Sequence, residues 1–215
     1  MQGESTIIYL AFVLVSVLLS MTLHEAMHGF VAYWLGDDTA ERHGRLTLNP
    51  IAHIDPFATV LLPLILAAHG APPFGAAKPV PFDPNKVRWG DYGAALVGLA
   101  GPLTNLVLGF LGFALFTLVH GSGLLSDFLQ VFFVVNIAFF VFNIIPLPPL
   151  DGSRVLYAFA PDAARQVMET IERYGLVAIF AVVVLFNAQL GAYMSSAIVA
   201  IIHLFSLPFG VSIGV

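Results

Sequence analysis

The chain has 215 residues, of which 59% are hydrophobic and only 10% are charged, and it contains no cysteine. Soluble domains carry about 25% charged residues, so this composition predicts one multi-pass membrane domain over residues 1–215 and excludes disulfides and thiolate metal ligands. A net charge of −5 also excludes the broad basic surface that nucleic-acid binding requires.

The first apolar run, residues 7–35, contains two histidines and a glutamate: His24, Glu25 and His28. Such side chains are costly in hydrocarbon, so their presence indicates a function. Residues four apart share one helix face, so both imidazoles can bind one ion while Glu25 reaches a water, as in zinc hydrolases. The alternative is a hydrogen-bonded histidine pair inside a membrane helix. Because Glu4 precedes the run and no basic residue does, we expect a retained helix rather than a cleaved signal peptide.

Two polar segments follow, residues 36–56 and 70–85, and their prolines, asparagines and aspartates predict strands and turns. His53, in the first segment, is expected to be solvated or hydrogen-bonded locally, and the alternative is that it contacts the site. The apolar run between the segments is shorter than the roughly 20 residues that a crossing helix needs. We therefore predict that residues 57–70 enter the membrane and return.

The next apolar run, residues 93–119, contains a Gly-Pro pair, Gly101 and Pro102, followed by Asn105. The pair permits close packing and a kink, and Asn105 adds a hydrogen-bonding group to an apolar helix. Small and polar residues are also ordinary at helix interfaces in membranes. This element therefore carries weight only together with the others.

The run 128–147 ends in three prolines among residues 146–149, and these are followed by Asp151 and Gly152. The prolines end the helix, so Asp151 is presented from an unwound segment, and Gly152 permits a close backbone approach. Catalytic zinc usually has three protein ligands, and Asp151 is the candidate for the third. The alternative is that Asp151 caps the helix that follows.

The remaining chain begins with residues 152–173, whose mixed charges predict an interfacial helix. Two further apolar runs, 174–190 and 192–209, are long enough to span. The predicted fold is thus an all-α polytopic membrane protein with about five transmembrane helices.

Three motifs together resemble the site-2 protease family of intramembrane zinc metalloproteases, in a compact form without PDZ or CBS modules: HExxH at 24–28, GPxxN at 101–105 and NxxPxPxLDG at 143–152. The match covers residues 7–157 and leaves 158–215 as accessory helices. The resemblance implies a substrate cut within or near its own transmembrane helix, and a re-entrant segment with short β-strands beside the active site. It also implies one Zn²⁺ per chain and the following roles: ligands His24, His28 and Asp151, catalytic base Glu25, and substrate-binding Asn143 and Asn105.

The basic residues predict the topology, because all eight lie in three segments, 42–45, 78–88 and 154–173. The positive-inside rule assigns these segments to the cytoplasm. The ligands give a second constraint: His28 and Asp151 can meet only if an even number of crossings separates the ends of their helices. We therefore expect the site toward the cytoplasmic side of the cell (inner) membrane.

Two other functions are compatible with this sequence. The first is a membrane metal-binding or transport protein, in which intramembrane histidine and aspartate line an ion path. The second is a non-catalytic binder of membrane helices. Transport, however, does not require Glu25 beside a ligand.

Overall fold

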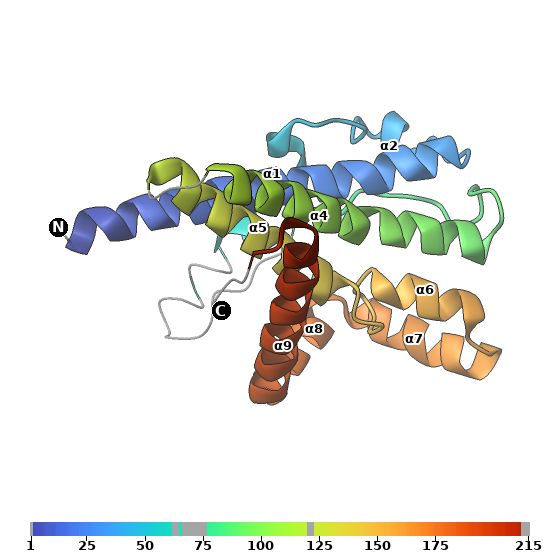
Figure 1. Ribbon diagram of the computed structural model, residues 1–215. Helices are drawn as coiled ribbons and strands as arrows, with labels where there is room; N and C mark the ends of the chain where they lie inside the picture. Colours follow the sequence, from blue (N-terminus) through green and yellow to red (C-terminus); the bar gives the residue numbers. More distant parts are fainter. Residues whose placement is uncertain (1, 62–64, 66–76, 120–122, 212–215) are drawn as a thin grey trace.

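The computed structural model describes residues 2–61, 65, 77–119 and 123–211. Three long helices lie side by side, and two shorter ones flank the start of the second (Figure 1). The long helices are α1 (Gln2–Trp34), α4 (Asp91–Val119) and α5 (Leu124–Asn143), and the shorter ones are α6 (Gly152–Phe159) and α7 (Asp162–Tyr174). The chain continues through α8 (Leu176–Leu185), α9 (Asn187–Ser206) and η3 (Leu207–Phe209).

Four helices in the described part of the chain are long and apolar enough to cross a membrane: Thr6–Trp34, Asp91–Val119, Leu124–Asn143 and Asn187–Phe209. The protein is therefore a multi-pass integral membrane protein. The span predicted at 174–190 is absent. Gly175, with φ of +46°, separates α7 from α8, and the helix breaks again at Phe186. The ten residues of α8 extend only about 15 Å, half the hydrocarbon thickness.

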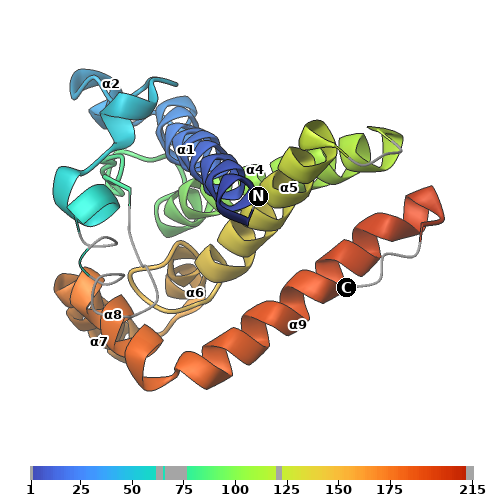
Figure 2. The same ribbon diagram turned by 90° about the vertical axis from the view of Figure 1, so that its left-hand side faces the viewer.

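Helix α4 lies at the centre because its small residues let neighbouring helices approach. A Cβ atom on Gly109 would lie 3.1 Å from Ile137 of α5, and one on Gly112 would lie 2.9 Å from Phe132. Phe113, fully buried, joins these helices to the end of α9 through Phe205. Figure 2 shows that α9 lies across the direction of α1 rather than along it.

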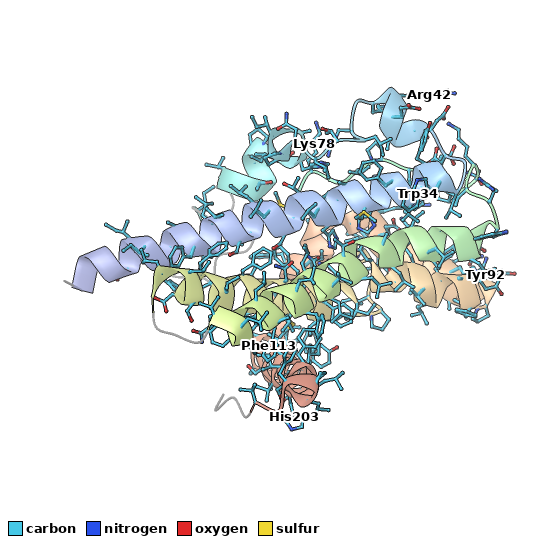
Figure 3. All side chains as sticks on the ribbon, turned by 45° about the horizontal axis from the view of Figure 1, so that its top comes forward. Trp34, Arg42, Lys78, Tyr92, Phe113 and His203 are labelled. Carbon is cyan, nitrogen blue, oxygen red and sulfur yellow. The ribbon has the colours of Figure 1, made fainter. Side chains whose placement is uncertain are left out.

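The segment between α1 and α4 begins and ends at the same end of the bundle. The amide of Arg88 donates to the carbonyl of Leu35 at 2.8 Å, and the amide of Asp83 donates to the buried carboxylate of Asp37 at 2.6 Å. Trp34, Arg42 and Tyr92 lie at this end (Figure 3). The end of α1 and the start of α4 therefore lie together, in agreement with the prediction that the chain makes no net membrane crossing between them.

The short strands predicted within 36–56 and 70–85 do not occur in the described residues. Helix α2 (Thr39–Arg42) and η1 (Pro50–His53) occupy part of the first segment. Residues 77–83 have neither helix nor strand, because Pro79 and Pro81 lack the N–H groups that a strand ladder needs. The predicted re-entrant segment 57–70 begins with η2 (Pro56–Leu61), and most of its remainder lies outside the described residues.

Candidate metal centre

Three ligand atoms from two distant parts of the chain form a small triangle. The Nε2 atoms of His24 and His28, four residues apart on α1, are 3.1 Å apart. Asp151 Oδ2 lies 3.0 Å from the first and 3.5 Å from the second. Tetrahedral zinc with bonds of about 2.0–2.1 Å places its ligand atoms about 3.3 Å from one another. The three residues are thus spaced to hold one metal ion.

The carboxylate of Asp151 is delivered by a tight turn after α5. Asp151 occupies the N-cap position of α6, but its side chain makes no capping hydrogen bond. It faces the two histidines instead. Gly152 is required in this turn because a Cβ atom there would overlap the carbonyl of Ile144 and lie 2.8 Å from that of Ile145.

Gly101 gives the ligand atoms their space on the side of α4. A Cβ atom at this position would lie 2.6 Å from Nε2 of His24 and closer still to Nε2 of His28. Both distances are shorter than van der Waals contact, so any larger residue would collide with the ligand atoms. The close packing predicted for the Gly-Pro pair therefore occurs at the metal-binding edge of the two imidazoles.

Hydrogen bonds from α4 orient both imidazoles. His28 Nδ1 lies 2.7 Å from the carbonyl of Val97, and His24 Nδ1 lies 2.6 Å from Oδ1 of Asn105. A carbonyl can only accept, so each Nδ1 carries the hydrogen and each Nε2 presents its lone pair to the triangle. Such outer bonds fix the tautomer and ring orientation of metal-binding histidines.

Asn105, the other residue predicted to bind substrate, is fully buried in the bundle. Its amide nitrogen donates to the carbonyl of Ser20 at 3.3 Å and to Oδ1 of Asn136 at 3.0 Å. These bonds fix its Oδ1 toward His24. Asn105 therefore lies directly behind one imidazole.

Asn136 is a further member of this network that the sequence analysis missed. It is fully buried on α5, and its amide nitrogen donates to the carbonyl of Phe132 at 2.9 Å. The available signal was an amide in the middle of a mostly apolar span, where polar groups are costly.

The side chains of Glu25 and Asn143 form hydrogen bonds outside the triangle of ligand atoms. Glu25 is half-buried, and its Oε2 accepts a 3.0 Å hydrogen bond from the amide of Val80. Asn143, also half-buried, donates to Phe139 of its own helix at 3.0 Å. The structure therefore does not bring the side-chain amide of Asn143 into the cluster of ligand atoms.

Comparisons with known proteins indicate the family of the chain. Residues 119–186 match the family described as Peptidase family M50. The chain is 40% identical to the proposed zinc metalloprotease YwhC of Bacillus subtilis (strain 168), over 85% of this chain and 83% of that protein. It is 31% identical to the proposed zinc metalloprotease Rip2 of Mycolicibacterium smegmatis, over 74% of this chain and 61% of that protein. No solved structure matches the chain significantly.

Proposed function

The chain belongs to peptidase family M50, and on this premise we propose that it is an intramembrane zinc metalloprotease that cuts membrane proteins within or near their transmembrane segments. The observation that carries the proposal is the triangle of ligand atoms next to the carboxylate-bearing Glu25. His24, His28 and Asp151 hold one Zn²⁺ per chain. Bound zinc supplies Lewis-acid chemistry for amide hydrolysis.

Glu25 serves as the base in this proposal. Glu25 directly follows the ligand His24 in sequence. Its side chain therefore leaves α1 in a different direction from the two imidazoles, at the same level of the helix. Its carboxylate takes a proton from the attacking water and passes it to the leaving nitrogen. Metal transport does not require such a group beside a ligand, and this favours hydrolysis over the transport alternative.

The substrate must unwind before it is cut, because a transmembrane helix hides its carbonyls in its own hydrogen bonds. Asn143, at the end of α5, is the proposed contact for the unwound strand. Its amide would have to exchange the carbonyl of Phe139 for the substrate. We expect this end of the bundle to lie at the cytoplasmic face of the cell membrane, because the positive-inside rule favours that side for the basic segments.

Metal removal tests the proposal. The purified protein in detergent should contain about one zinc per chain and should cleave a membrane-protein substrate. A chelator should abolish cleavage, and added zinc should restore it. A chain that cleaves equally well after its metal has been removed would contradict the proposal.

Removal of the amide behind His24 should weaken metal binding without abolishing it. We expect Asn105→Leu to lower zinc affinity about 10-fold to 100-fold, the usual cost of losing a hydrogen-bond partner of a metal ligand. A competition titration with a zinc-binding dye measures the change. The matched control is Thr104→Val. The hydroxyl of Thr104 donates to the carbonyl of Ala100 in its own helix, so this variant should keep the wild-type affinity. Unchanged affinity in Asn105→Leu would contradict the assigned role.

A further inference from the structure

A loop segment reaches the proposed base. The amide of Val80, a buried residue, donates to Oε2 of Glu25 at 3.0 Å. Val80 belongs to the segment Lys78–Phe82, in which Pro79 and Pro81 alternate with the other three residues. Proline fixes its own φ and keeps the preceding residue extended. The segment is therefore stiff, and a displacement at Lys78 will be transmitted to Val80.

Helix α1 is shaped to receive this segment. Gly29 lies one helical turn after Glu25 and on the same face. A Cβ atom on Gly29 would lie 3.2 Å from Cγ1 of Val80 and 3.4 Å from Cδ1 of Leu46. The glycine thus lets Val80 pack directly on α1, with its amide beside the carboxylate of Glu25.

Arg45 holds the other end of the stiff segment. Its Nη2 donates to the carbonyl of Lys78 at 2.7 Å, and the amide of Lys78 donates to the carbonyl of His53 at 3.0 Å. His53 is fully buried, and its Nε2 lies 2.9 Å from the carbonyl of Thr47. Both the carbonyl and the amide of Lys78 are therefore hydrogen-bonded to residues that follow α2 in the chain.

The guanidinium of Arg45 is poorly explained by stability alone. The side chain is only 8% exposed, and its Nε is buried without a hydrogen-bond partner. Among the described residues it forms no ion pair with a carboxylate, in contrast to Arg42, which pairs with Asp38 at 2.5 Å. Burying a charge without a counter-ion is costly, so a purpose beyond packing is indicated.

We propose that Arg45 is a positioning residue for the base. By holding the carbonyl of Lys78, it fixes the segment Lys78–Phe82 so that the amide of Val80 binds one carboxylate oxygen of Glu25 and orients the other for proton transfer. This inference rests on the proposed role of Glu25.

The two prolines make the structural part directly measurable. Within Lys78–Phe82 only three residues carry amide hydrogens, and two of them, Lys78 and Val80, are hydrogen-bonded. Hydrogen exchange of a peptide that covers this segment should show two slow amides in the wild type. Arg45→Gln should make both exchange quickly, whereas Glu25→Ala should release only Val80. Retained protection of Val80 in Arg45→Gln would overturn the proposal.

Kinetics on the same variants test the functional part. Arg45→Gln should lower kcat about 10-fold to 100-fold, the scale of a misplaced catalytic group, with KM and zinc content unchanged. Lysine has a longer side chain than glutamine and can still bring a donor to the carbonyl of Lys78, so Arg45→Lys should recover most of kcat. Arg42→Gln, which removes an exposed ion pair, is the control and should match the wild type.

The outcomes separate this inference from the proposed function. Wild-type kcat in Arg45→Gln, alongside an active wild-type enzyme, would overturn the positioning role. Arg45→Met, which keeps the packed stem, replaces Arg45→Gln if that variant does not accumulate, with the same expected results. Absence of cleavage by the wild type itself would contradict the proposed function, and the exchange of Val80 would still decide whether Arg45 holds the segment.

Discussion

The substitution Gly101→Ala should empty the metal centre although it replaces none of the three ligand residues. The added methyl group would lie 2.6 Å from Nε2 of His24, within the space that an ion and its ligand atoms need. We expect the zinc content to fall from about one per chain to near zero and cleavage to fall with it. Elemental analysis of the purified variant measures the first effect.

The matched control lies on the same helix. Gly109→Ala adds the same methyl group to α4, but against Ile137 of α5 at 3.1 Å rather than against the ligands. It should keep its zinc even if it costs some stability. Gly101→Ala with full zinc occupancy and wild-type affinity would contradict the geometry of the centre.

Much of this centre was predictable from the sequence, because its ligands follow from local rules. The spacing of His24 and His28 depends only on the helical period, and the prolines before Asp151 indicate where the helix ends. The structure brings these three residues together as predicted. It also places the end of α1 beside the start of α4, as the distribution of basic residues indicated.

The role of Asn105 was not predictable, because it depends on which helix faces which. Nothing in the motif tells whether the amide points to substrate or to a ligand. Only the packing of α4 between α1 and α5 places it between His24 and Asn136. For the same reason the contact between Val80 and Glu25 could not be found from spacing, since 55 residues separate them.

The predicted fold and the observed fold differ at two places, and both differences have local causes. Hydropathy treats 174–190 as one apolar run, yet Gly175 has a positive φ and Phe186 ends α8 after ten residues. Pro-rich segments suggested strands beside the site, but alternating prolines deprive residues 77–83 of ladder donors. The amide of Lys78 binds the carbonyl of His53 instead, and the amides of Val80 and Asp83 bind the carboxylates of Glu25 and Asp37.

Replacement of Glu25 by glutamine should separate metal binding from catalysis. Glutamine has the same shape and can still accept the hydrogen bond from Val80, so the segment Lys78–Phe82 should stay in place. It cannot accept the proton, and loss of general acid–base catalysis typically costs about 10²-fold to 10⁴-fold in rate. Cleavage of a membrane-protein substrate in detergent measures the loss.

The most direct test combines both quantities in one preparation of Glu25→Gln. Zinc content and cleavage rate are measured on the same purified sample, beside the wild type and Asp151→Ala. For Glu25→Gln we expect about one zinc per chain with cleavage reduced at least about 10²-fold, whereas Asp151→Ala should lose both zinc and cleavage. Cleavage at the wild-type rate by Glu25→Gln would contradict the role of Glu25 and the mechanism that depends on it.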